Sequence, residues 1–592
     1  MTIQQGPVSP TDKPKNTKAT LRRLLKYIGD VKLLFLLAIV LVLTANGLQL
    51  LGPYFTGEVI DLIAIAHLRD VWSDITTIII IMIVVYVIAS ILLYALSALM
   101  IIISQKIVVK MRQQLFNKFM DLPAKYFDNH QIGDMISRIS YDIDTINTSL
   151  STDVVQFFGS LITILGALGM MMIISLPLLS VFVITLPLAI LTTSYLAKRT
   201  RPLFRQRSKK LGDLNGYVEE TISGLKTIKA YAQQETMIAG FKEKNEDASE
   251  AYYKADYYGS VMGPSIGFIN NISLALISFF GSLLYLFSMI TIGNISSFIL
   301  YSRRFAGPIT EGANMVAELQ STLAAAERVF RVLDEPIEQN HEVVQLAKPS
   351  IKGHVVFDRV SFSYIPTIPV ISDMSLNIKP KSVVAIVGPT GAGKTTMVNL
   401  LMRFYSPQQG RILIDDQDIQ QIPFKNLRQY FSMVLQDTWL FHGSIYENII
   451  YGSEHATLDQ VKDVVKRVHL QSFVENTKNG YDTIITDDGV NISKGQKQLI
   501  TIARAMLQDK PMVILDEATS NVDTLTEKRI QDAMQKLMQH KTSFVIAHRL
   551  STIVNADLIL VVADGQVVEQ GKHKQLMAKE GFYHRLYMAQ FE

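Results

Sequence analysis

The segment GPTGAGKTT, at 388–396, has residue types and a spacing that suit the binding of phosphate groups. It follows the apolar run SVVAIV and precedes the apolar segment MVNLLMRF, so the order predicts a strand, a glycine-rich turn and a helix. Gly391 and Gly393 let the backbone turn its N–H groups towards phosphate oxygens, and a helix N-terminus adds positive potential. Lys394 is placed to reach the β- and γ-phosphates, and the Thr395 hydroxyl is placed to ligate Mg²⁺. The loop residues predicted to bind the nucleotide are Gly388, Pro389, Thr390, Gly391, Ala392, Gly393, Lys394, Thr395 and Thr396.

Other polar side chains follow short apolar runs that are predicted to be strands. Asp516 and Glu517 follow the run MVIL, where Asp516 would hold Mg²⁺ through water and Glu517 would polarise the attacking water. His548 ends the run SFVIAH and is placed to touch the γ-phosphate, although a histidine satisfied at a strand end is the alternative. Gln436, after the run SMVL, would by itself be an ordinary loop amide.

These segments lie in the more polar half of a chain that is too long for one domain. The 592 residues are 48% hydrophobic and 19% charged, but long uncharged stretches occur only before about residue 320. This contrast predicts a membrane half followed by a soluble half. The net charge of +4 is too small to indicate nucleic-acid binding. Cysteine is absent, which excludes disulfides, thiol catalysis and cysteine metal sites.

The uncharged stretches predict six membrane spans, because about 20 apolar residues are enough to cross a bilayer. Two stretches are each twice the length of one crossing and must fold back, at Ser175-Leu176-Pro177 and at Gly293-Asn294. The stretches are 33–57, 75–105, 154–197 and 257–302.

Basic residues gather before the first predicted span and after the second and fourth spans. The positive-inside rule therefore places both termini in the cytoplasm. The long inner segments, 106–153 and 198–256, are predicted to be helical. Residues 1–20 are polar and do not resemble a signal peptide, and 21–28 has the pattern of a helix on the membrane surface. The alternative for 21–28 is the start of the first span.

Arg303 and Arg304 lie in or beside the sixth predicted span, in YSRRFAGP. A charge inside the membrane is a candidate for a substrate contact. A location at the cytoplasmic end, or a simple ion pair, is the alternative explanation.

In their order, these motifs resemble those of the ATP-binding cassette (ABC) exporters, and the resemblance covers essentially the whole chain. It implies a six-helix transmembrane domain of the exporter fold, followed by an α/β P-loop nucleotide-binding domain. The expected segments are an N-terminal segment with an elbow helix at 1–30, the transmembrane domain at 31–325, a linker at 326–350 and the nucleotide-binding domain at 351–592.

The resemblance also implies a role for each motif residue. Tyr364 would stack on adenine, and Gln436 would be the Q-loop glutamine that links Mg²⁺ to the membrane domain. ILDEAT resembles Walker B, with Asp516 as a Mg²⁺ ligand and Glu517 as the catalytic carboxylate. Asp523 would belong to the D-loop, and His548 would be the switch histidine. Segments 127–139 and 224–235 resemble the intracellular loops whose short coupling helices dock on nucleotide-binding domains.

NISKGQKQ resembles the family signature Leu-Ser-Gly-Gly-Gln, which completes an ATP site on the opposite subunit. Ser493, Gly495 and Gln496 match it, whereas Lys494 replaces a glycine. A Cβ at that position is expected to limit the backbone angles and the approach of phosphate. One altered signature beside a complete set of other motifs indicates one half of a heterodimeric exporter. A homodimer that tolerates Lys494 is the alternative.

The resemblance implies ATP-driven export of hydrophobic or amphipathic compounds, either drugs or lipids, across the cytoplasmic membrane. It also implies ATP and Mg²⁺ as cofactors and a second half-transporter as partner. The alternatives are a homodimeric lipid flippase or peptide exporter and, in another class, an ATP-gated channel or regulatory subunit. The sequence names neither the substrate nor the residues of its pocket.

Overall fold

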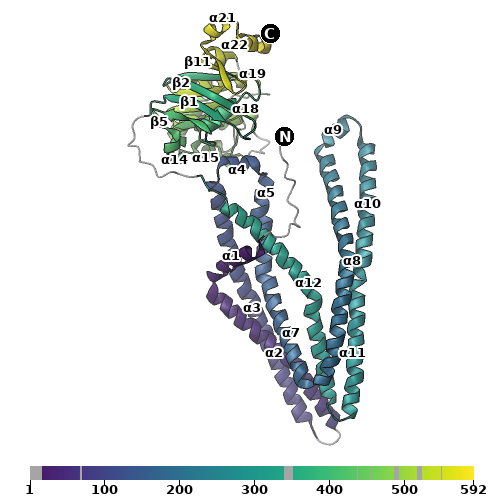
Figure 1. Cartoon of the computed structure of the whole chain (residues 1–592). Helices are drawn as coiled ribbons and strands as arrows, with labels where there is room; N and C mark the ends of the chain where they lie inside the picture. The colour runs from purple at the N-terminus through teal and green to yellow at the C-terminus, as the bar shows by residue number, and fades with distance from the viewer. Residues whose placement is uncertain are drawn as a thin grey trace. The chain divides into compact units, whose positions relative to one another are not determined.

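The computed structural model describes residues 16–591, except for 67–69, 339–350, 437, 454, 486–491, 517–522 and 548–549. Its contacts divide the chain into two units (Figure 1). The helical unit comprises 1–120 and 132–335, and the nucleotide unit comprises 121–131 and 336–592.

The helical unit consists of long helices, as the uncharged stretches predict. They are α1 (Thr17–Gly29), α2 (Lys32–Ile65), α3 (Trp72–Asp121), α5 (Ile132–Ser137), α6 (Ile143–Thr148), α7 (Val154–Ile174), α8 (Leu176–Ser223), α9 (Leu225–Ala230), α10 (Gln234–Ser260), α11 (Met262–Leu286) and α12 (Ile292–Asp334). Two π-helical turns, η1 (Arg138–Asp142) and η2 (Ser149–Asp153), join α5, α6 and α7 into one continuous helix. Figure 1 shows α8 and α10 side by side and joined by the short α9.

Within the described residues, five helical segments are long and apolar enough to cross a membrane: 32–65, 72–121, 132–174, 176–223 and 234–286. The sixth predicted span corresponds to the first part of α12, which contains Arg303 and Arg304 and does not reach the same apolarity. However, α12 packs against α2, α7 and α11, which lie in three of those segments. It therefore belongs to the same bundle.

One of the two predicted fold-back points is confirmed, and the other is shifted. Ser175 separates α7 from α8 and caps α8, accepting a hydrogen bond from the N–H of Leu178 at 3.4 Å. The second turn lies at 287–291, whereas Gly293-Asn294 belongs to the first turn of α12. The reason is capping: the Thr291 hydroxyl accepts from the N–H of Asn294 at 3.0 Å, whereas Gly293 has no side-chain oxygen with which to accept such a bond.

Helix α1 is separate from the first span, as the surface-helix hypothesis expects. It ends at Gly29, and α2 begins at Lys32. Arg23 forms an ion pair with Asp334 at 2.7 Å, and its guanidinium lies over the ring of Phe330. Helix α1 is thus attached to the last turns of α12, which continues to Asp334 through the first part of the expected linker.

The nucleotide unit is built around a six-stranded, mostly parallel sheet in the order β12-β11-β3-β10-β9-β6. Its strands are β3 (Val383–Val387), β6 (Phe431–Val434), β9 (Met512–Asp516), β10 (Thr542–Ile546), β11 (Leu558–Ala563) and β12 (Gln566–Gly571). A four-stranded antiparallel sheet contains β1 (Val355–Phe362), β2 (Ile371–Ile378), β4 (Gln409–Ile414) and β5 (Gln417–Asp418), and a two-stranded sheet contains β7 (Gly443–Ser444) and β8 (Ile484–Ile485).

Short helices surround these sheets. They are α4 (Ala124–Asn129), α13 (Lys394–Leu401), α14 (Phe424–Arg428), α15 (Ile445–Ile450), α16 (Leu458–Arg467), α17 (Gln471–Glu475), α18 (Lys494–Gln508), α19 (Thr524–Met538), α20 (Leu550–Val554), α21 (His573–Ala578) and α22 (Phe582–Phe591), with the 3-10 turns η3 (Ile419–Gln421) and η4 (Gly480–Asp482).

Strand β3 shows why the central strands are continuous apolar runs. Successive side chains of a strand point to opposite faces of its sheet. Ala385 and Val387 pack into the hydrophobic cluster that includes α18 and α19. Val384 and Ile386 pack into the cluster formed with α13 and the antiparallel sheet. Because both faces of β3 are covered, its residues are apolar, and the polar motif residues lie at or beyond the strand ends.

Helices α2 and α12 approach each other closely at Gly57 and Gly293. A Cβ on Gly293 would lie 2.1 Å from the carbonyl oxygen of Gly57, so the contact requires glycine. Asp61 secures the same point, because it accepts hydrogen bonds from the Thr291 hydroxyl at 2.6 Å and the N–H of Gly293 at 2.7 Å.

We expect Gly293→Ala to destabilise the helical unit, because the added methyl group overlaps backbone atoms that cannot rotate away. Overpacking of this kind typically costs about 1–3 kcal/mol. Thermal unfolding of the purified protein in detergent should show a lower midpoint. Gly263→Ala is the matched control: Gly263 is also the second residue of its helix, α11, and a Cβ there meets nothing within 4 Å. Equal midpoints for the two variants would contradict the close contact.

Candidate nucleotide site

The predicted phosphate loop joins β3 to α13 in the expected strand–turn–helix order. Gly391 and Gly393 have φ angles of 83° and 101°, in the left-handed region that favours glycine. At Gly388, a Cβ would lie 2.1 Å from the carbonyl oxygen of Val562 on the neighbouring β11. The glycines are therefore required by the turn and by its close approach to the sheet.

Lys394 opens α13 and folds back over the loop. Its ammonium group donates hydrogen bonds to the carbonyl oxygens of Gly388 at 2.8 Å and Pro389 at 3.0 Å. Burial lowers the pKa of Lys394, and the negative charge of Asp516 partly opposes that shift. A buried cation with incomplete charge compensation is suited to a phosphate group.

The hydroxyls of Thr395 and Thr396 have different environments. Thr395 is exposed in the first turn of α13, where its hydroxyl is available to a metal ion. Thr396 is buried, and its hydroxyl accepts a hydrogen bond from the hydroxyl of Tyr364 at 3.2 Å. Thr396 therefore holds the side chain of Tyr364. Pro389 and Thr390 are exposed on the loop, whereas Ala392 is buried beneath it.

Tyr364 follows β1 and is positioned by several contacts. Its ring meets the rings of Phe362 and Tyr405 edge to face, each with a centroid separation of 4.9 Å. Its hydroxyl also accepts a hydrogen bond from the amide of Asn399 on α13 at 3.2 Å. The ring remains 41% exposed, so it is fixed in orientation and still accessible to a stacking partner.

The carboxylate and amide candidates lie at the same edge of the sheet. Asp516 is the last residue of β9 and pairs in register with Ile546 at the end of β10. Gln436 is exposed two residues after the end of β6. Glu517 and His548 lie outside the described residues, so their roles remain predictions. The described donors, Thr395, Gln436 and Asp516, are oxygen ligands of the kind that Mg²⁺ prefers.

The signature segment forms the start of α18. Ser493 is the N-cap, and a reciprocal capping box joins it to Gln496, with N···O distances of 2.9 and 3.2 Å. Gly495 is buried in the first turn, and Lys494 is the exposed first residue of the helix.

The expected backbone restriction at Lys494 is therefore wrong. A residue at the first helical position has an ordinary helical conformation, which lysine adopts without strain. What lysine changes is the charge at the N-terminus of α18, which already has positive potential.

Asp523 is the N-cap of α19, and its carboxylate accepts a hydrogen bond from the N–H of Thr526 at 2.9 Å. This backbone hydrogen bond lowers the pKa of Asp523. In the structure, the aspartate predicted for the D-loop therefore makes a capping contact within its own chain.

Comparison with known proteins identifies both halves of the chain. Residues 35–309 match the model of the ABC transporter transmembrane region, and residues 371–520 match the ABC transporter model. The chain is 40% identical over 581 residues to an uncharacterized ABC transporter ATP-binding protein of Bacillus subtilis, covering 98% of this chain and 96% of the relative. The chain belongs to the ABC transporter family.

Two other relatives have more informative names. A fatty acid ABC transporter ATP-binding/permease protein of Mycobacterium bovis is 45% identical over 482 residues, covering 81% of this chain and 76% of the relative. An ATP-dependent lipid A-core flippase of Nitrosococcus oceani is 34% identical over 493 residues, covering 83% and 82%. With a transmembrane region followed by an ATPase domain, the chain is an ABC exporter half-transporter in which ATP hydrolysis is coupled to transport.

In this ABC transporter, the nucleotide unit includes a segment that continues directly from the long helix α3. Helix α4 overlaps the start of the first predicted coupling segment, at 127–129, and Asp128 in this overlap accepts a hydrogen bond from the hydroxyl of Tyr405. Burial, together with that bond, raises the pKa of Tyr405, so the hydroxyl keeps its proton. Because the ring of Tyr405 meets Tyr364, one side chain connects α4 to the predicted adenine-stacking residue.

A second attachment lies beside this one. Arg428 donates two hydrogen bonds to Glu338, at 2.8 and 3.0 Å, and the N–H of Glu338 donates to the carbonyl of Asp121 at 3.0 Å. The sequence pattern did not reveal Tyr405 or Arg428 as functional residues. The only signal was the aromatic pair in RFY after the phosphate-loop helix, which is equally typical of a core contact.

The second predicted coupling segment contains α9, none of whose residues is buried.

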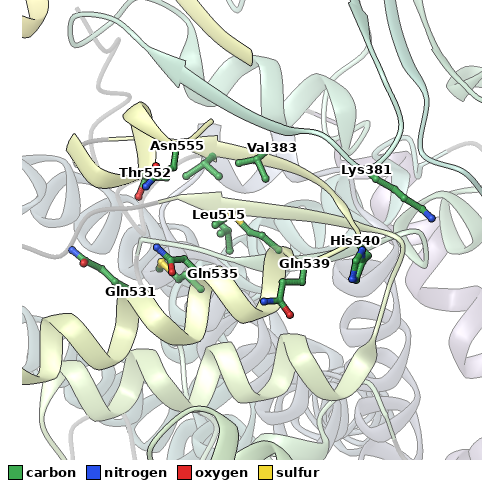
Figure 2. Close-up of a pocket in the computed structure, with 12 residues that line it drawn as sticks. Lys381, Val383, Leu515, Gln531, Gln535, Gln539, His540, Thr552 and Asn555 are labelled. Atoms are coloured by element: carbon green, nitrogen blue, oxygen red, sulfur yellow. The ribbon is translucent and has the colours of Figure 1, made fainter. Parts of the chain in front are cut away.

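A cavity of about 420 Å³ lies on the α19 side of the sheet, but no residue of the phosphate loop lines it. Figure 2 shows Gln531, Gln535 and Gln539 along one side, with Leu515 and Val383 of the sheet opposite. The cavity is therefore distinct from the predicted nucleotide site.

Tyr405→Phe removes the hydrogen bond to Asp128 and keeps the ring that meets Tyr364. We expect nucleotide affinity to stay within about two-fold of the wild type, because the lost bond is not to nucleotide. The increase in ATPase rate caused by a transported compound should fall, because the attachment of α4 is weakened. Rates with and without the compound measure this.

Tyr405→Leu is the control, because it also removes the ring contact and should weaken nucleotide binding. A tyrosine-to-phenylalanine variant with unchanged stimulation would show that the bond to Asp128 plays no part in coupling.

Proposed function

We propose that this ABC exporter moves amphipathic, lipid-like compounds out of the cytoplasm across the cytoplasmic membrane, using ATP with Mg²⁺. The observation that carries the proposal is similarity over most of the chain to a protein named as a fatty acid transporter and to one named as a lipid A-core flippase. The charged residues in α12 are consistent with a substrate that has a polar head as well as an apolar part.

The geometry of the nucleotide unit suits this activity. Lys394 and the glycine-rich loop would hold the phosphates, the ring of Tyr364 would hold the adenine, and Thr395, Gln436 and Asp516 would hold Mg²⁺. Glu517 would orient the attacking water, and His548 would contact the γ-phosphate. Binding of ATP would join two nucleotide units and turn the cavity outward, and hydrolysis would reset it. The link through Tyr405 to α4 would pass that change to α3.

The test is reconstitution of the purified transporter into proteoliposomes with a fluorescent fatty acid or phospholipid. We expect ATP-dependent movement of the labelled lipid between leaflets. Glu517→Gln should abolish nearly all movement and turnover while ATP still binds, because a general base typically contributes about 10²–10⁴-fold. ATP-dependent ion currents without lipid movement would favour the channel alternative and refute the proposal.

We further propose that the functional assembly is a dimer with a second, different half-transporter. The support is the altered signature, in which Lys494 stands where the family has glycine. Because Lys494 causes no backbone strain, its effect would be electrostatic, at the ATP site that the partner's phosphate loop completes. The site built on this chain's own Lys394, Asp516 and Glu517 would be the faster one.

Lys494→Gly distinguishes the two assemblies. In a heterodimer whose partner has its own defect in that site, turnover should change by less than about two-fold, whereas Glu517→Gln should silence nearly all of it. The measurement is the ATPase rate of the chain produced alone and produced together with a candidate partner half-transporter. Full activity of this chain alone, raised further by glycine at position 494, would establish a homodimer instead.

A further inference from the structure

Two adjacent arginines, Arg303 and Arg304, lie near the middle of the bundle. Arg303 is eleven residues after Ile292, the first residue of α12, which corresponds to roughly 16 Å along a helix. The hydrocarbon core of a bilayer is about 30 Å thick. Since α12 packs among α2, α7 and α11, both side chains start near the middle of the apolar layer. The alternative of a location at the cytoplasmic end does not fit this depth.

Arg304 has a structural role. Pro53, inside α2, has no N–H, so the carbonyl of Gln49 lacks its intrahelical donor. Arg304 replaces that donor, with its Nη1 atom 2.7 Å from the Gln49 oxygen. The hydroxyl of Tyr301 donates to the carbonyl of Leu50 at 2.6 Å, beside this bond. Arg304 therefore satisfies the carbonyl that Pro53 leaves without a donor in α2.

Arg303 lies on a different face of α12. One set of α12 residues bonds to α2: Ser297, Tyr301 and Arg304. A second set, Phe298 and Phe305, is buried in the core cluster of the bundle. Helical spacing places Arg303 away from both sets, on the same face as Ser296 and Gly307. Arg303 is exposed, and it forms no hydrogen bond or ion pair with any residue that the structure describes.

That face is unsuited to lipid chains, because an unpaired charge near the centre of the membrane is costly. It is also open: a Cβ on Gly307 would meet nothing within 4 Å, and Ser296 is small. A cation that pairs with no described residue, with Gly307 one turn further along the same face, has the charge and the space to receive an anion. The guanidinium group matches a carboxylate in particular, because it can donate two parallel hydrogen bonds.

We propose that Arg303 binds the carboxylate of a long-chain fatty acid within the transport cavity, and so selects for acidic amphiphiles. This inference rests on the proposed lipid-export function and names the substrate class for it. The role of Arg304 differs, because its charge is already used within the protein.

The experiment compares two ligands that differ only in the head group, oleate and oleyl alcohol. The assembled transporter is placed in phosphatidylcholine nanodiscs at alkaline pH, where the carboxylate is ionised. The measured quantity is the ligand concentration that gives half-maximal ATPase stimulation, and binding of radiolabelled oleate is measured on the same samples.

For Arg303→Gln, we expect the half-maximal oleate concentration to rise roughly ten-fold or more, as loss of a charged hydrogen-bonded pair implies. The value for oleyl alcohol should move by less than about two-fold, because no charge is involved. Arg303→Lys should recover part of the oleate response. Arg304→Gln is the matched control: it should lower the thermal unfolding midpoint and change the responses to both ligands alike.

Three results would contradict the proposal, and each has a different meaning. If Arg303→Gln changes the half-maximal concentrations of oleate and oleyl alcohol equally, or changes neither, the carboxylate contact is refuted while lipid export stands. If the variant separates the two chains of the assembly, measured by size-exclusion chromatography, Arg303 pairs with the partner chain and the inference is overturned. If the wild type responds to neither amphiphile, both the proposed function and this inference fall.

Discussion

Parallel pairing of β3, β9 and β10 is the constraint on which the chemistry of the nucleotide unit depends. Residue-by-residue register aligns Ile386 with Ile546 and Ile546 with Asp516, so the three strands end at one edge. Both faces of these strands are covered, and the polar groups predicted to bind nucleotide lie at or beyond the carboxyl ends of the strands. The pairing of the strands is thus sufficient to place the phosphate loop and Asp516 at the same edge of the sheet. Burial of Lys394 at this edge then leaves a cation whose charge is only partly compensated, which is the feature a phosphate group requires.

That edge also has a mechanical connection. Tyr364 is held by Thr396 and Asn399 of the phosphate-loop helix, and its ring meets Tyr405, whose hydroxyl donates to Asp128 of α4. Each contact depends on the one before it, since a ring that shifts alters the edge-to-face geometry of its neighbour. A change at the nucleotide therefore has a physical route to α4, and along the chain to α3. The ion pair of Arg428 with Glu338 attaches the chain that follows α12 to the same unit.

The sequence was sufficient for features that depend on local chemistry and was insufficient for features that depend on tertiary contacts. The glycine-rich loop, the strands beside it and the fold-back at Ser175 could be predicted because steric and capping rules act over a few residues. The backbone at Lys494 could not be judged, because whether a position needs glycine depends on whether it precedes or begins the helix. Tyr405 and Arg428 were missed because an aromatic or basic residue in a core contact has the same pattern. The roles predicted for Glu517 and His548 still rest on the sequence.

The low apolarity of α12 has its explanation in α2. Pro53 interrupts the hydrogen bonds of α2 inside the bundle, and the carbonyl of Gln49 needs a donor that a purely apolar neighbour cannot supply. Arg304 supplies that donor, and Tyr301 donates to the adjacent carbonyl of Leu50, so α12 is polar on the face that meets α2. Once one arginine is satisfied in this way, a second arginine on the next face cannot be explained by the same need. The polar character of α12 therefore has two sources, a proline in its neighbour and an open face of its own.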